Sequence, residues 1–229
     1  MRLKAAAILA AFLLVAGCTP SAVDTAGEKI EKERAEKIAK AEARLKANGA
    51  KAAADRKAAI PNAAARAKLL AGLKAERDDF QKITFYTDPV IDGTYDSRIY
   101  LYIGEDQNKR SYSLRMVVRY HGESWVFWDR ALFNVGGDVV EVKPRTVKRD
   151  SSTSVWEQAD FVVATGAVGE DRLQFSEEGA AIFAKLMQAS GPVTMRFAGE
   201  HTKDRTIPAD ELRRFKDVGR RYMALFGLK

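Results

Sequence analysis

Cysteine and histidine are scarce in this chain of 229 residues, which contains one cysteine and two histidines. A single cysteine excludes an internal disulfide framework and a thiolate metal cluster. His121 and His201 do not form an HExxH motif or another metal-ligand spacing. We therefore expect no metal or other cofactor, and we expect stability to come from side-chain packing.

Long hydrophobic runs are also lacking. The apolar run Ala5–Ala16 has 12 residues, whereas a membrane-spanning helix needs about 20. It follows a basic start with Arg2 and Lys4 and precedes small residues, which is the pattern of a secretory signal peptide. The sequence therefore predicts a signal peptide over residues 1–17.

The lone cysteine stands directly after this segment. Val15-Ala16-Gly17-Cys18 resembles the lipobox of bacterial lipoprotein precursors. The resemblance implies that the Cys18 thiol receives a diacylglyceryl group, that the signal is cut before it, and that the new amino terminus is acylated. Several acyl chains make membrane anchoring stable. Thr19 at the next position implies the outer membrane, facing the periplasm, in a Gram-negative host. An ordinary signal peptide with a cysteine near its cleavage site is the alternative.

The net charge of +7 suggests a nucleic-acid partner until its distribution is considered. Residues 1–17 carry two basic and no acidic residues. Residues 18–80 carry 14 basic and 10 acidic residues, and residues 81–229 carry 22 basic and 21 acidic residues. Because the last segment is almost balanced, we expect no nucleic-acid partner. The excess fits a solvated stalk that could also touch anionic lipid or a cell-wall polymer.

The composition after Cys18 predicts an extended connection. Residues 18–27 read as the lipidated cysteine and a flexible tether, because small and polar residues predominate. Residues 28–80, rich in Glu, Lys and Ala, predict a charged helical spacer. Asn48-Gly49 predicts a stop within it, and the last helix is expected over residues 62–80.

Apolar residues are sparse in the spacer. Ile30, Ile38 and Leu45 are eight and seven residues apart, which is nearly a heptad spacing. Pairing of residues 28–80 with another chain, as a coiled coil, is therefore the alternative to a solvated spacer.

The hydrophobic period changes to alternation from residue 83 onward. Residues 98–104 and 111–121 alternate most clearly, and both are predicted to be strands. Residues 121–124 predict a hairpin turn into a strand over residues 125–135, and Gly136-Gly137-Asp138 predicts a second turn. Further strands are expected at residues 83–87, 139–142, 155–164, 172–175 and 193–198, with polar segments at 143–154 and 201–205.

Two helices complete the expected domain. Ser176 is placed to cap a helix over residues 177–189, and Pro208 opens the last helix. Residues 81–229 thus predict a β-rich globular domain. The fold class is α+β: a signal and helical spacer, then an antiparallel β-sheet or small β-sandwich with one or two packed helices.

The C-terminal half also carries a resemblance. YLYIG, the strand pair around Trp125 and MRFAGEHTKDRTI before the last helix are similar to a domain of uncharacterised bacterial exported and phage-encoded proteins. The resemblance implies a fold and no activity.

The best candidate site is a surface rather than a catalytic motif. If the strands at residues 98–104 and 111–121 are neighbours, their polar side chains share one face. Arg and Tyr suit the recognition of anions, glycans or a partner protein. A structural role, with the rings covered by a helix, is the alternative. The candidate residues are Arg98, Tyr100, Tyr102, Arg115, Arg119 and His121.

The motifs predict a protein that is not an enzyme. Gly122-Glu-Ser-Trp-Val126 lacks the closing glycine of a nucleophile elbow, and Gly166-Ala-Val-Gly169 lacks the Lys of a phosphate loop. We expect a membrane-anchored lipoprotein whose domain binds an envelope protein or cell-wall polymer. The alternatives are a cell-wall hydrolase with an unrecognised carboxylate site and an assembly component that acts through its helices.

Overall fold

A computed structural model describes residues 22–91, 96–151, 154–168 and 173–228. The chain divides into two units, Met1–Ala52 and Ala53–Lys229, and each is described by itself. Cys18 and the expected signal peptide lie outside the described residues.

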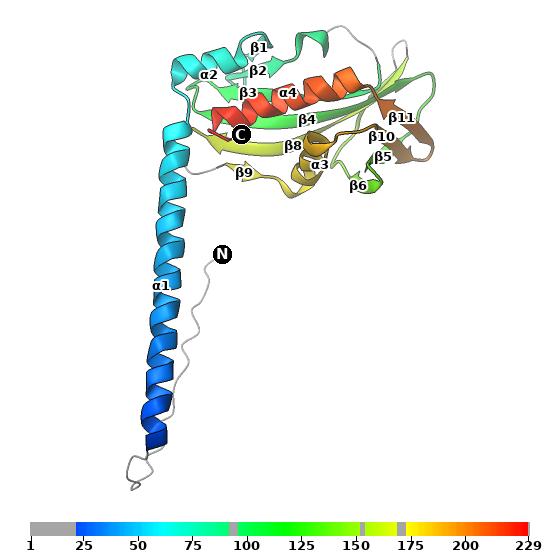
Figure 1. The fold of residues 1–229 in the computed structure, drawn as a ribbon. Coiled ribbons are helices and arrows are strands. Elements are labelled where there is room, and N and C mark those ends of the chain that lie inside the picture. Colours follow the sequence, from blue (N-terminus) through cyan, green and yellow to red (C-terminus); the bar gives the residue numbers. More distant parts are fainter. Residues whose placement is uncertain (1–21, 92–95, 152–153, 169–172, 229) are drawn as a thin grey trace. The chain divides into compact units, whose positions relative to one another are not determined.

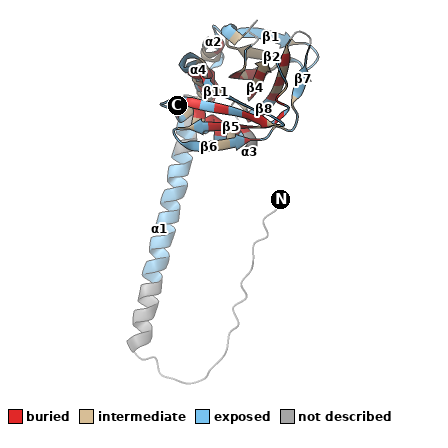
Figure 2. Ribbon diagram, turned by 90° about the vertical axis from the view of Figure 1, so that its right-hand side faces the viewer, coloured by how far each residue is buried: buried red, intermediate tan, exposed pale blue. Residues whose placement is uncertain are grey.

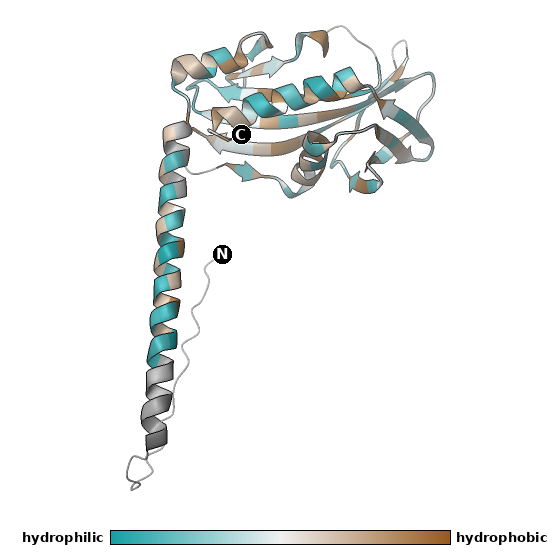
Figure 3. Ribbon diagram, viewed as in Figure 1, coloured by the Kyte–Doolittle hydropathy of each residue, from teal (hydrophilic) through white to brown (hydrophobic). Residues whose placement is uncertain are grey.

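Helix α1 (Ala22–Ala59) is one uninterrupted helix of 38 residues, roughly 57 Å long. It starts inside the expected tether, and it passes through Asn48-Gly49, so the predicted stop there is wrong. One glycine costs only about 1 kcal/mol, which the surrounding Ala and Lys residues outweigh. Ile38 and Leu45 are 58% and 72% exposed, and hydrophilic residues follow the helix along its length (Figure 3). Among the described residues, no helix is long and apolar enough to cross a membrane.

Helix α2 (Ala63–Leu70) is short, and the helix expected over residues 62–80 is wrong beyond it. Asn62 caps its start by accepting a hydrogen bond from the Ala65 amide, and the chain turns at Gly72, where φ is +82°. Strand β1 (Lys74–Asp78) follows and pairs with β2 (Ile83–Thr87). Pairing with β2 outweighs the helix propensity of its Lys, Ala and Glu residues.

The domain is α+β with antiparallel sheets, as the sequence predicts, and its larger sheet curls into a half-barrel (Figure 2). Seven strands form this sheet in the order β1-β2-β3-β4-β8-β7, with β9 paired to β8. A short 3-10 helix, η1, covers Pro89–Ile91. The remaining strands of the sheet are β3 (Arg98–Asp106), β4 (Ser111–Gly122), β7 (Lys148–Asp150), β8 (Val155–Ala167) and β9 (Gln174–Phe175).

A four-stranded sheet, in the order β11-β10-β5-β6, completes the β structure. The predicted hairpin at residues 121–124 is wrong, because β4 pairs with β3 and β8 while β5 pairs with β6 and β10. The turn at Gly136-Gly137 is confirmed, with φ of +61° and +96°. The strands are β5 (Trp128–Val135), β6 (Asp138–Val142), β10 (Val193–Gly199) and β11 (Thr202–Ile207), the last of which lies where a polar turn was expected.

Helices α3 (Glu177–Gln188) and α4 (Ala209–Leu225) pack on the sheets. Ser176 caps α3 by accepting from the Gly179 amide, as predicted. Figure 1 shows α4 crossing one face of the larger sheet. The core between these elements contains large, fully buried side chains, among them Trp128, Phe133, Phe161, Phe197, Phe215 and Tyr222.

A buried carboxylate holds the crossover between the two sheets. Glu157 on β8 is 0% exposed, and its two oxygens accept hydrogen bonds from the consecutive amides of Val126, Phe127 and Trp128 at 2.7–3.0 Å. Arg149 on β7 donates to the same carboxylate at 3.1 Å and to the Trp128 carbonyl at 3.1 Å. One side chain therefore satisfies three backbone donors that no strand ladder pairs.

The crossover backbone is tightly constrained. Phe127 has φ of +52°, a conformation that non-glycine residues rarely adopt. A Cβ atom on Gly199 would lie 2.1 Å from the Phe127 carbonyl oxygen, so only glycine fits at the end of β10. The amide of His201 donates to the Val126 carbonyl at 3.1 Å. The crossover is thus fixed from both sheets.

We predict that Glu157→Gln lowers the free energy of unfolding by about 3 kcal/mol, because an amide nitrogen then faces backbone donors and Arg149 loses its charged partner. Urea unfolding at neutral pH measures this loss. Glu123→Gln, at an exposed position in the same connection, is the control and is expected to change stability little. Equal effects of the two substitutions would contradict the role assigned to Glu157.

Candidate functional site

The strand register brings the candidate residues of β3 and β4 onto one face. Arg98 lies opposite Arg119, and Tyr102 lies opposite Arg115. Tyr100 lies opposite Val117, between these two pairs. The juxtaposition expected from the alternation of the two strands is therefore present.

Strand β8 extends this face with residues that sequence reasoning missed. Arg115 lies opposite Val162, Arg119 opposite Gln158, and Val117 opposite Asp160. A β-bulge follows Leu114, immediately before Arg115. We call the surface formed by these residues the polar face, and it comprises Tyr100, Tyr102, Arg115, Val117, Arg119, Gln158, Asp160 and Val162.

Asp160 is the shared acceptor of the polar face. One of its oxygens accepts from the Tyr102 hydroxyl at 2.6 Å, and the other accepts from Arg115 Nε at 2.9 Å. Because charge-assisted hydrogen bonds are about twice as strong as neutral ones, this pair fixes both donors in place. The Phe85 ring packs edge-on against Tyr102, with ring centroids 5.7 Å apart.

Arg119, four residues further along β4, is also held by hydrogen bonds to neighbouring side chains. Its Nε donates to Gln158 Oε1 at 2.7 Å, and its guanidinium lies 5.8 Å from the Tyr100 ring centroid. A longer hydrogen bond of 3.5 Å joins Arg119 to the Tyr100 hydroxyl. Val117 beneath these side chains is only 1% exposed. The polar face is therefore an ordered layer that covers apolar surface with its aliphatic stems.

Arg98 and His121 lie beside this layer, and no hydrogen bond described above joins either of them to it. Arg98 is 9% exposed, and among the described residues its Nε has no hydrogen-bond partner, so it is a buried side chain rather than a surface contact. His121 is half-buried opposite Trp156, and its Nε2 lies 2.6 Å from Ser154 Oγ. Four of the six candidates, Tyr100, Tyr102, Arg115 and Arg119, are therefore half-buried members of one hydrogen-bonded layer.

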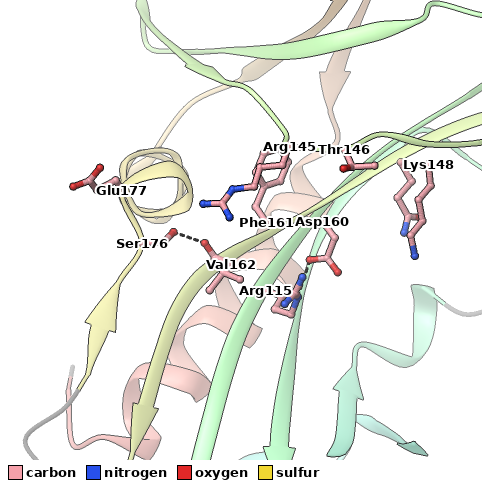
Figure 4. A pocket seen from close by; sticks show the side chains of 10 residues that line it. Arg115, Arg145, Thr146, Lys148, Asp160, Phe161, Val162, Ser176 and Glu177 are labelled. Carbon is pink, nitrogen blue, oxygen red and sulfur yellow. Dashed lines mark hydrogen bonds and ion pairs between the residues drawn. The ribbon is translucent and has the colours of Figure 1, made fainter. Parts of the chain in front are cut away.

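A cavity of about 650 Å³ opens on the polar face between β8, the segment before β7 and the start of α3 (Figure 4). Arg115, Gln158 and Asp160 form part of its wall. Arg145 and Lys148 come from residues 143–154, where the sequence predicts a polar segment, and Lys148 begins β7. The excess of basic residues in residues 143–154 was the signal that could have found them. Thr146, Phe161, Val162, Ser176 and Glu177 complete the lining.

A second cavity, of about 520 Å³, lies further along the same two strands. Ser113 on β4 and Thr165 on β8 face each other in the register and line it. Gly104 on β3 also lines it, and a Cβ atom there would lie 2.6 Å from Ser113 Oγ. The small residues make this end of the sheet face hollow.

The chemistry of the site is hydrogen bonding and ion pairing. Within the part of the chain that the structure describes, no group of three or more His, Cys, Asp or Glu side chains is placed to hold a metal ion. The His121–Ser154 pair has the separation of a base and a hydroxyl nucleophile. Neither residue lines the two cavities described above.

The two tyrosines of the polar face have different roles, because the Tyr102 hydroxyl donates to Asp160 and the Tyr100 hydroxyl accepts from Arg119. Burial raises the pKa of Tyr100, and burial together with the hydrogen bond to Asp160 raises the pKa of Tyr102. Both values lie above the ordinary value of 10.0.

Comparison of the chain with protein-family models, curated proteins and solved structures finds no match.

We predict that the free energy of unfolding falls with pH above about 10, because the unfolded chain ionises its tyrosines there while the folded chain keeps Tyr102 protonated. The stabilisation is fully present below the unfolded pKa and is lost as pH rises towards the folded value. Urea titrations at several pH values test this, and Tyr102→Phe should make the fall shallower. An unchanged slope in that variant would contradict the shift.

Proposed function

We propose that the chain is a bacterial lipoprotein, anchored at Cys18, whose β-rich domain is a non-enzymatic binding module of the cell envelope. The anchor rests on the Val15–Cys18 motif and the signal-like segment before it. The 38-residue helix α1 supports the role of a spacer, because its described side chains are exposed along its length.

The observation that carries the binding role is the ordered polar face. Arg115 and Arg119 are each aimed by a side-chain acceptor on β8, and Tyr102 shares the acceptor of Arg115. Side chains that are fixed before binding lose less conformational entropy when a ligand arrives. A cavity of about 650 Å³ opens directly on this layer, within the size range of ligand pockets.

A cell-wall hydrolase is the second candidate, because Asp160 and Glu177 line the same cavity. Two carboxylates that flank a bound sugar could act as acid and base. Shortened products after incubation of the full chain with cell-wall material would favour this candidate over binding alone.

We predict that Cys18→Ser moves the protein from the membrane fraction to the soluble fraction, because the thioether to the lipid cannot form. Metabolic labelling with a palmitate analogue should be lost in the same variant. Thr19→Ser, which keeps the cysteine, is the matched control and should behave like the original chain. Unchanged fractionation and labelling of Cys18→Ser would contradict the anchor.

We also predict that a photo-crosslinking residue introduced at Val162, on the polar face, forms a covalent adduct with the ligand in living cells. The same photo-crosslinking residue introduced at Val139 should form no such adduct. The two positions are 37% and 60% exposed, and Val139 lies on β6 in the other sheet. Combining the Val162 probe with Arg115→Gln and Arg119→Gln should reduce the adduct at least fivefold, because the charges are lost while the stems are kept.

Arg196→Gln is the control for this experiment, because Arg196 forms an exposed ion pair with Asp204 on the smaller sheet. An adduct from Val139 alone, or one that survives the double substitution, would overturn the binding role of the polar face. Urea unfolding of each variant verifies that the fold is kept.

A further inference from the structure

We propose that a cavity beside helix α2, which we call the α2 cavity, binds a free amino acid with an aliphatic side chain. It has a volume of about 360 Å³ and is lined by residues of α2 and of strands β2, β3 and β4. It shares no lining residue with the larger cavity of the polar face, so this inference goes beyond the proposed function and does not rest on it. Three observations carry it: a buried acid held by two tyrosines, two basic residues, and an apolar wall.

The buried acid stands where the strand pattern places apolar residues. On β3, Leu101 and Ile103 are buried in the core at alternate positions, and Glu105 continues this row. Glu105 is 5% exposed and lies opposite Tyr112 of β4. The α2 cavity therefore lies on the core side of the sheet, whereas the polar face is on the other side.

Two tyrosines hold both oxygens of this carboxylate. The Tyr86 hydroxyl donates to Oε2 of Glu105 and the Tyr112 hydroxyl donates to Oε1, each at 2.8 Å. Burial, together with the contact to Glu105, raises the pKa of Tyr86 to about 12, so this hydroxyl keeps its proton. Because each hydroxyl has one hydrogen, the three side chains keep acceptor lone pairs and have no spare donor. All three line the α2 cavity, which therefore suits a ligand group with several donors, such as an ammonium group.

Two basic residues border the same acceptors. Arg66 of α2 lines the cavity, and its guanidinium opposes the rise in the pKa of Tyr112 that burial causes. Lys109 lines the cavity from the turn between β3 and β4, and its carbonyl accepts from the Tyr112 hydroxyl at 3.3 Å. Arg66 is half-buried and Lys109 is exposed, which places Lys109 at the opening. A carboxylate of the ligand would meet guanidinium and ammonium donors there.

Helix α2 supplies the apolar wall. Ala63, Ala67 and Leu70 line the cavity from one side of the helix, at spacings of four and three residues. Leu73, just after the helix, lines it as well. The volume is near the lower end of the range for ligand pockets, so the α2 cavity suits a small molecule. A donor group for Glu105, an acid group for Arg66 and an aliphatic part along α2 are together the three parts of one amino acid.

Isothermal titration of the full chain tests this inference with L-leucine and three analogues, each of which lacks one part. 4-Methylpentanoate lacks the ammonium group, isoamylamine lacks the carboxylate, and glycine lacks the aliphatic side chain. We expect leucine to bind at least tenfold more tightly than each analogue, because each omission leaves one set of lining groups without a partner. Leucine should also raise the melting temperature of the full chain.

Substitutions on α2 locate the binding. Ala67→Phe, which fills the cavity, should weaken leucine binding at least tenfold. Ala64→Phe, at an exposed position of the same helix that does not line the cavity, should leave it unchanged. Arg66→Gln should weaken leucine binding at least fivefold, and Lys68→Gln is its control, because Lys68 is exposed and does not line the cavity. Urea unfolding of each variant verifies that the fold is kept.

A substitution at the acceptors tests the placement of the ammonium group. Tyr86→Phe keeps the ring and removes one oxygen, and Glu105 stays in place with Tyr112 as its donor. This variant should weaken the binding of leucine more than that of 4-methylpentanoate, which has no ammonium group to lose a partner. Equal weakening of both would overturn the placement.

The remaining outcomes are decisive and separate from the proposed function. Absence of leucine binding to the original chain overturns the inference and leaves Glu105 with the structural role of holding its tyrosines. Equal affinity for leucine and any one analogue overturns the amino-acid assignment. Unchanged binding in Ala67→Phe overturns the location. The anchor and the polar face are tested at Cys18 and Val162, and their outcomes do not depend on leucine.

Discussion

The carboxylate of Glu157 is the constraint on which the domain depends most. It binds three consecutive amides at the point where the chain leaves the seven-stranded sheet for the four-stranded one. A buried carboxylate without such partners would be strongly destabilising. Because Arg149 donates to the same group, Glu157 also fixes β7 against β8. The strand that carries Lys148, and with it one wall of the larger cavity, is therefore positioned by a core interaction.

The two faces of β8 carry different groups, one buried in the core and the other on the polar face that we propose as the binding surface. Glu157 points to the interior, and its neighbours in the chain, Gln158 and Asp160, belong to the polar face. Gln158 accepts a hydrogen bond from Arg119 of β4, and Asp160 accepts one from Arg115 of β4. Asp160 also accepts a hydrogen bond from the Tyr102 hydroxyl. The long side chains of the polar face are therefore held by side-chain acceptors as well as by packing. A surface of this kind is consistent with the proposed binding role, because its groups are held in place before a ligand arrives.

Alternation in the sequence was sufficient to predict β3, β4 and the side of the sheet that their polar residues share. It could not predict Asp160, because Arg115 and Asp160 are 45 residues apart and only the strand order brings them together. The segment Lys74–Asp78 was misassigned because Lys, Ala and Glu favour helix locally, whereas its pairing with β2 is tertiary. The hairpin at residues 121–124 was wrong because the positive φ of Phe127 and the Glu157 contacts turn the chain towards another sheet. Arg98 follows the polar alternation and is nevertheless buried.

We propose that the layer formed by Arg115 and Arg119 is the surface that contacts a ligand in the envelope. Nitrogen-15 NMR of the arginine side chains in the full chain, recorded before and after addition of solubilised envelope material, tests it most directly. We expect the Nε–H signals of Arg115 and Arg119 to shift or broaden, and that of Arg196, on the smaller sheet, to stay unchanged. Shifts confined to Arg196 or to α1, with Arg115 and Arg119 unchanged, would contradict it.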